Sequence, residues 1–155
     1  MEQKELLDFF EKEFLKIKAD LGFKAGLDEI DKIFFVKDMI LKEGFVSEML
    51  SRQICNRITE TLMQWNSYVY NLIFPNPGDM ILGSESKAIS QEDKNELWKL
   101  MRKSMELVSR NSIIGLSKDK KIEAKFIDDS LDFWNMKFNP KVIEIVKKIN
   151  SEWGK

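Results

Sequence analysis

Apolar residues recur every three or four positions along most of the chain, and this spacing constrains the fold more than any other feature. The first segment carries one such series, Leu7, Phe10, Phe14, Ile17 and Leu21, with Lys and Glu between its members. Residues at this spacing lie on one side of an α-helix, whereas a half-buried strand needs alternation with a period of two. No segment shows that alternation. We therefore expect an all-α fold.

Turn and capping signals divide the chain into about six expected helices. Gly22 and Gly44 follow apolar series and are typical of helix ends. Ser90 with Asp93 resembles a capping box, and Asn139 followed by Pro140 is typical of a helix start. The expected helices cover residues 2–21, 28–43, 47–73, 90–115, 117–134 and 139–153.

Length and composition indicate one soluble domain. The 155 residues, 43% of them hydrophobic, fit a single helical domain over residues 1–155, arranged as a bundle with a long central third helix. The net charge of -1 provides no global field to attract nucleic acid or anionic lipid, so nucleic-acid binding is not expected. No apolar run is long enough for a membrane span or a signal peptide. We expect a cytoplasmic protein that does not enter a membrane.

The residue types present restrict the possible chemistry. The chain has no histidine, which removes the commonest general base and most zinc, haem and non-haem iron sites. The single cysteine, Cys55, cannot form an internal disulfide, and its apolar neighbours indicate a buried core residue in a reducing compartment. We assign no catalytic residue, no metal ligand and no cofactor. The sequence favours a non-catalytic protein and leaves an enzyme as the alternative.

The expected third helix, residues 47–73, lacks a charged solvent face. Its second face carries Met49, Met63 and Tyr70 with a few polar residues, and no charged residue occurs between positions 61 and 78. Such a helix either packs against neighbours on both sides or lends its second face to a partner. The opposite face carries a regular core series, Leu50, Ile54, Ile58, Leu62, Trp65, Val69 and Leu72.

Two hypotheses for function follow from this helix. The first is self-association, with a dimer favoured, or binding of a protein partner through the second face. The alternative is a small-molecule or metal-carboxylate binding protein or enzyme, with a pocket between the third helix and the following loop. A buried Arg52 would need a carboxylate or an anionic ligand, and Glu48 is its nearest partner in sequence. The candidate ligand or interface residues are Arg52, Asn56, Thr59, Met63, Trp65 and Tyr70.

Residues 75–89 interrupt the helical pattern with Pro, Gly and Ser and form the expected long loop. The candidate loop residues Asn76, Pro77, Gly78 and Asp79 fit a type II turn, in which the glycine takes a positive φ. The apolar residues 80–82 are expected to hold the loop against the bundle. We interpret the loop as a crossover that lets the third and fourth helices run parallel, or else as a lid or partner-binding loop.

Overall fold

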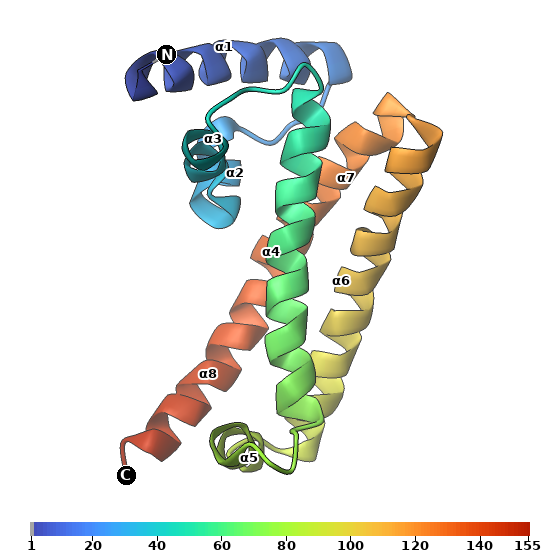
Figure 1. The fold of residues 1–155 in the computed structure, drawn as a ribbon. Helices are drawn as coiled ribbons and strands as arrows, with labels where there is room; N and C mark the ends of the chain where they lie inside the picture. The colour runs from blue at the N-terminus through green and yellow to red at the C-terminus, as the bar shows by residue number, and fades with distance from the viewer. Residues whose placement is uncertain (1) are drawn as a thin grey trace. The chain divides into compact units, whose positions relative to one another are not determined.

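The computed structural model describes residues 2–155, and within them every regular element is helical, as Figure 1 shows. This confirms the all-α fold and the helical bundle. Because α7, η1 and α8 run on without a break, the described residues form seven separate helical rods rather than about six. The elements are α1 (Gln3–Leu21), α2 (Leu27–Phe34), α3 (Val36–Glu43), α4 (Leu50–Ile73), α5 (Met80–Lys87), α6 (Gln91–Ser117), α7 (Lys120–Phe133), the π-helix η1 (Trp134–Phe138) and α8 (Asn139–Trp153).

The described residues divide into two compact units. The first unit comprises the chain up to Thr61 together with Ser109–Leu131, and the second comprises Leu62–Val108 together with Asp132–Lys155. Helices α4, α6 and α7 therefore contribute residues to both units. The single domain expected over residues 1–155 stays a prediction.

In the first unit, the helix expected over residues 28–43 is two helices, α2 and α3. Phe35 lies between them in the left-handed region, with φ 53° and ψ 48°, and its N–H donates to the Asp31 carbonyl at 2.9 Å. The Asp31 carboxylate in turn accepts from the N–H of Lys37 at 2.9 Å and so caps α3. Gly22 and Gly44 end α1 and α3 with positive φ, as expected.

Helix α4 has the expected core face with one exception. Six of the seven expected core residues are buried, which confirms that side of the helix, but Trp65 is 37% exposed and does not belong to the core. Cys55 is fully buried, as expected. Burial raises the pKa of its thiol, and the nearby Glu123 carboxylate raises it further.

The expected loop over residues 75–89 contains the short helix α5, so residues 80–82 form its first turn. They do not hold the loop against the bundle as expected, because Met80 and Ile81 are 84% and 65% exposed. The Asp79 carboxylate caps this helix by accepting from the N–H of Leu82 at 3.0 Å. The turn before it forms as expected, because the Asp79 N–H donates to the Asn76 carbonyl at 2.9 Å. It is not a type II turn, since Gly78 does not have a positive φ.

In the second unit, α6 runs antiparallel to α4, so the crossover interpretation is wrong. Asn66 of α4 meets Met105 of α6, whereas Phe74, further along the chain, meets Trp98, which comes before Met105 (Figure 1). The physical reason lies in α5, which uses eight residues of the connection. A helix rises only about 1.5 Å per residue, against about 3.3 Å for extended chain, so α5 shortens the distance that this connection can span along α4.

The expected capping box at the start of α6 is present. The Asp93 N–H donates to the Ser90 hydroxyl at 3.0 Å, and the Ser90 N–H donates to the Asp93 carboxylate at 3.4 Å. Lys148 and Lys141 of α8 also donate to this buried carboxylate, at 2.8 and 3.4 Å. The hydrogen bond from Lys148 is the main reason why the pKa of Asp93 falls to about 2. Asp93 therefore joins α6 to α8.

Asn139 and Pro140 do not begin a separate helix, because α7 continues through η1 into α8. Pro140 has no N–H to donate, and its ring crowds the carbonyl four residues earlier, at Met136. The backbone accommodates this by widening into a π-helix, in which the Asn139 N–H reaches the Trp134 carbonyl five residues back. This widening places the Trp134 and Phe138 rings in a stack, with centroids 4.9 Å apart.

Candidate functional site

The six candidate residues on α4 lie in three different places. Arg52, Asn56 and Thr59 belong to the first unit, whereas the other three belong to the second. Met63 and Tyr70 line a groove beside α6, and Trp65 lines a different groove, beside α8. The structure therefore does not bring the candidates together in one site.

Arg52 lies in a partly buried polar cluster of the first unit. Its guanidinium donates to the side-chain oxygens of Asn111, at 3.0 Å, and Asn56, at 3.3 Å, and lies 3.6 Å from the buried carboxylate of Glu123. Gly115 leaves room for the guanidinium, because a Cβ at that position would lie 3.4 Å from an Arg52 nitrogen. The carboxylate that Arg52 requires is thus Glu123, which is distant in sequence, and not Glu48.

A cavity of about 340 Å³ lies beside this cluster and is lined by Arg52, Glu48, Lys118 and Glu123, among others. Arg52 already has an internal counter-charge and two amide partners there. The Thr59 hydroxyl donates to the Cys55 carbonyl at 3.0 Å, within its own helix. These contacts describe a structural ion pair with its supporting hydrogen bonds.

An apolar stripe follows α4 and α6 in the second unit. Its members each expose between 40% and 53% of their surface. Tyr70 and Phe74 rings lie 5.3 Å apart, and Phe74 and Trp98 rings lie 6.0 Å apart, so the stripe is continuous from one helix to the other. We call this surface the α4–α6 stripe; it consists of Met63, Tyr70, Phe74, Trp98 and Met105.

The interior packing considered for the second face of α4 does not occur at Met63 and Tyr70, because both are exposed. They line a groove of about 390 Å³ together with Met105, and the buried side chain of Asn66 also lines it. The Asn66 amide nitrogen lies 3.2 Å from the Met105 sulfur, a weak acceptor, and its buried oxygen has no hydrogen-bond partner among the described residues. Leaving a buried acceptor unpaired costs about 1–3 kcal/mol.

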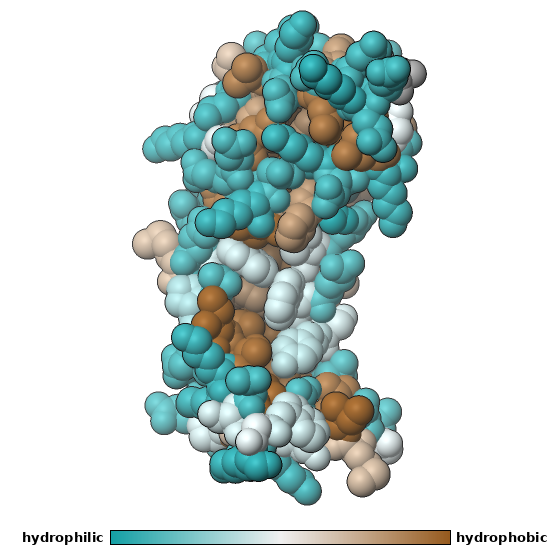
Figure 2. All heavy atoms as spheres, turned by 90° about the vertical axis from the view of Figure 1, so that its left-hand side faces the viewer, coloured by the Kyte–Doolittle hydropathy of each residue, from teal (hydrophilic) through white to brown (hydrophobic). Residues whose placement is uncertain are grey.

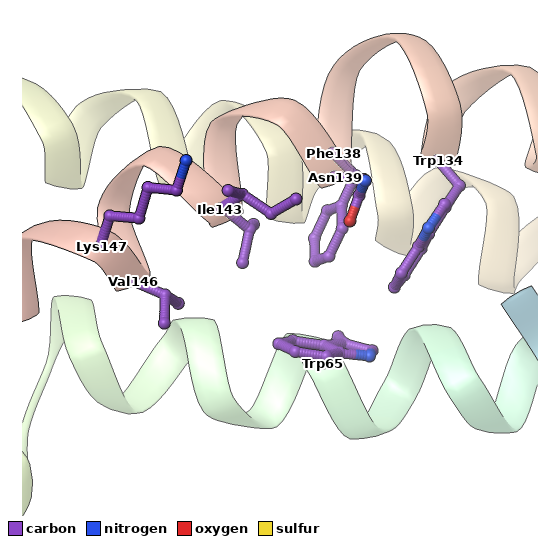
Figure 3. A pocket seen from close by; sticks show the side chains of 8 residues that line it. Trp65, Trp134, Phe138, Asn139, Ile143, Val146 and Lys147 are labelled. Carbon is purple, nitrogen blue, oxygen red and sulfur yellow. The ribbon is translucent and has the colours of Figure 1, made fainter. Parts of the chain in front are cut away.

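An aromatic groove of about 210 Å³ lies between α4 and the η1–α8 segment of the same unit (Figure 3). The Trp65 ring forms one wall, and the Trp134 and Phe138 rings face it with centroids 6.0 and 6.1 Å away. The complete lining, which we call the aromatic groove, is Trp65, Trp134, Phe138, Asn139, Val142, Ile143, Val146 and Lys147.

Apart from the indole N–H groups of its two tryptophans, the polar side-chain groups of the aromatic groove are one amide, Asn139, and one ammonium, Lys147. Figure 3 shows the Lys147 side chain running along α8 toward Ile143. A second hollow of about 430 Å³ shares Trp65 and Val146 with the groove. On the face that Figure 2 presents, hydrophobic and intermediate residues gather side by side between hydrophilic regions.

Three of the four candidate loop residues, all but Gly78, line a separate hollow of about 560 Å³. Asn76, Pro77 and Asp79 lie there with residues of α5 and with Lys94 of α6, while the lining includes no residue of α4. Two of their polar groups are used within the loop, since Asn76 accepts from the Gly78 N–H and Asp79 caps α5. The alternative function, with a pocket between the third helix and the loop, stays a prediction.

Sequence reasoning missed several residues that shape these surfaces. Trp98 and Met105 belong to the apolar series of α6 but are 40% and 42% exposed, whereas Leu97 and Met101 of the same helix are buried. Trp98 directly follows Leu97 in the sequence and therefore lies at the edge of the apolar face on the helical wheel. This position was the available signal that Trp98 is exposed. Nothing local in the sequence indicates that Phe138 faces Trp65. The sequence predicted a helix start at Asn139, whereas α7, η1 and α8 form one continuous helix through this position.

Comparison with protein families, curated proteins and solved structures finds no match for this chain. No group of three or more cysteine or acidic side chains that could hold a metal ion occurs within residues 2–155. In the same residues, no helix has both the length and the apolar character needed to cross a bilayer.

Proposed function

We propose that this protein is a non-catalytic helical protein of the cytoplasm that acts by self-association, and that the α4–α6 stripe is the interface between two copies. The observation that carries the proposal is the continuous run of exposed apolar side chains on two neighbouring helices. A binding partner other than a second copy would use the same surface. The cytoplasmic location is the expectation stated for the sequence, and a single cysteine without a disulfide partner fits a reducing compartment.

The size of the stripe supports this role. Five large side chains, each close to half exposed, present about 450 Å² of apolar surface per chain if a full side chain offers about 200 Å². The largest apolar patches of monomeric proteins reach about 300–600 Å² and are often functional. Two such stripes face to face would bury about 900 Å², less than the roughly 1,200 Å² of the smaller stable interfaces, so a stable dimer would also bury the polar rim around the stripes.

The composition of the stripe also fits an interface. Tyr, Trp, Phe and Met are enriched in interface cores, and charged residues are depleted there. Met63, Tyr70 and Phe74 lie in the part of the sequence that has no charged residue, between positions 61 and 78. The groove beside Met63 offers a place where a side chain of the second copy could insert. Asn66, with its unpaired oxygen, lies in the lining of this groove.

The test is the double substitution Met63→Glu with Tyr70→Glu, followed by light scattering during gel filtration at micromolar protein concentration. We expect the wild-type protein to elute as a dimer and the variant as a monomer, because each carboxylate buried without a partner costs several kcal/mol. Since both side chains are exposed in the single chain, the variant should stay folded and keep the helical circular dichroism of the wild type. Its unfolding midpoint should fall only by the stabilisation that dimer formation gives the wild type.

The matched control places two glutamates on other exposed apolar positions, Met80 and Leu116, which are 84% and 87% exposed. Met80→Glu with Leu116→Glu should leave the dimer intact. A wild-type protein that is monomeric throughout the concentration range would refute self-association. If both variants form dimers of equal stability, the interface lies outside the α4–α6 stripe and the proposal is refuted.

A further inference from the structure

The aromatic groove has the features of a binding site for a small molecule, and it is separate from the α4–α6 stripe. Three aromatic rings line it, and Ile143 and Val146 leave apolar surface exposed at its edge. Ligand pockets typically combine such an apolar lining with a few polar groups that fix the orientation of the ligand. Asn139 and Lys147 are the polar groups here.

The volume of the aromatic groove and the orientation of its aromatic rings indicate the size and shape of the apolar part of the ligand. A dry cavity of about 150 Å³ accommodates a benzene molecule, so about 210 Å³ accommodates one ring with a short substituent. The Trp65 ring stands at 68° to Trp134 and at 76° to Phe138, so a planar ring in the groove would meet both a face and an edge. Aromatic rings pack favourably in both arrangements.

The charge of the lining defines the polar part of the ligand. None of the eight lining residues is acidic, and Lys147 is the one charged residue among them. Within residues 2–155, Lys147 makes no ion pair or side-chain hydrogen bond, unlike Lys141 and Lys148 of the same helix, which pair with Asp93. A cationic ligand would be repelled by this ammonium, whereas a carboxylate would gain a charge-assisted hydrogen bond.

We propose that the aromatic groove binds a small aromatic carboxylate, with its ring against Trp65, Trp134 and Ile143 and its carboxylate beside Lys147. The site lies in the second unit and uses none of the stripe residues. The experiments that test binding in the aromatic groove and those that test self-association therefore give independent results.

The probe for the test is 3-phenylpropanoate, with the neutral isostere 3-phenylpropanamide as its partner, and binding is followed by a ligand-observed NMR titration. For a ligand of this size we expect a Kd on the order of 1 mM or below. Lys147→Gln should weaken carboxylate binding by up to about fivefold and leave amide binding unchanged, since an exposed ion pair contributes modestly. Lys137→Gln, an exposed lysine outside the groove, is the matched control.

A second variant tests the location without opening a cavity. Ile143→Trp places a larger side chain at the exposed edge of the groove and should weaken both probes by more than about tenfold. Met136→Trp changes an exposed residue outside the lining and should have no effect. The Met63→Glu, Tyr70→Glu variant should bind the probe as the wild type does.

Three results would overturn the proposal. The first is no binding of either probe to the wild-type protein at millimolar concentration. The second is equal binding of carboxylate and amide that Lys147→Gln does not change. The third is binding that persists in Ile143→Trp, which would place the probe elsewhere on the protein.

Discussion

Replacing Asp93 by Asn should lower the stability of the second unit by an amount that depends on pH. In the folded protein Lys148, Ser90 and Lys141 hold the pKa of this buried carboxylate at about 2, against an ordinary value of 3.8. Each tenfold difference in proton affinity corresponds to about 1.4 kcal/mol, so the ionised Asp93 contributes about 2 kcal/mol to the free energy of unfolding.

The sign of the pH dependence follows from the direction of the pKa change. Because folding lowers the pKa of Asp93, its contribution is fully present above the unfolded value of 3.8 and is lost as the pH falls toward about 2. Urea unfolding followed by circular dichroism should therefore show Asp93→Asn to be about 2 kcal/mol less stable than wild type at neutral pH. The difference should shrink as the pH approaches 2.

The exposed carboxylate of Asp132 provides the control, since Asp132→Asn should change stability by less than about 0.5 kcal/mol at either pH. A difference between wild type and Asp93→Asn that stays the same from neutral to acid pH would refute the reasoning. It would mean that the shape of the Asp93 side chain matters and its charge does not.

Three further substitutions or reactions test the buried polar groups. Arg52→Met should lower the free energy of unfolding in urea by about 3 kcal/mol, because it leaves the Glu123 carboxylate buried without its counter-charge. Adding Glu123→Met should restore most of this loss. A double variant whose loss of stability equals the sum of the two single losses would contradict this. Cys55 should react with a thiol reagent only when the protein opens, since burial and Glu123 raise its pKa; fast labelling of the folded protein at mildly alkaline pH would show that the thiol is accessible. Asn66→Leu should raise the free energy of unfolding by about 1 kcal/mol by removing an unpaired buried oxygen, and a measured loss would indicate a hydrogen-bond partner for that oxygen.

The sequence predicted those features that depend on neighbours along the chain. The spacing of apolar residues identified the core face of α4, and the Ser90 and Asp93 pair identified the start of α6. Both depend on residues three or four positions apart, which an isolated helix already brings together. Gly22 and Gly44 marked helix ends for the same local reason.

The errors occurred where tertiary structure overrides local preference. Phe35 adopts the left-handed region at the break between α2 and α3. This conformation is rare for a bulky residue, so the sequence gives no signal for the break. Pro140 was interpreted as a sign of a helix start, but the helix accommodates this proline by forming the π-helix η1 and continues into α8. The helix α5 was missed because residues 80–87 include a glycine and two serines, although Asp79 provided a usable N-cap signal.

The candidate site was harder to predict than the fold because it depends on contacts between distant segments. The sequence singled out Met63 and Tyr70 as members of a helix face without charge, and both are exposed, but it did not indicate that Trp98 of α6 is exposed as well. The Arg52 partner, Glu123, lies 71 positions away along the chain, so sequence proximity pointed to Glu48 instead. Which side chains meet across α4, α6 and α8 became clear only from the packing.

The most direct test of self-association through the α4–α6 stripe is native mass spectrometry of the wild-type protein at micromolar concentration. We expect a dominant species at about 36 kDa, twice the 18.2 kDa mass of the chain, that disappears in the Met63→Glu, Tyr70→Glu variant. A wild-type spectrum that contains only the 18.2 kDa chain would contradict the proposed function.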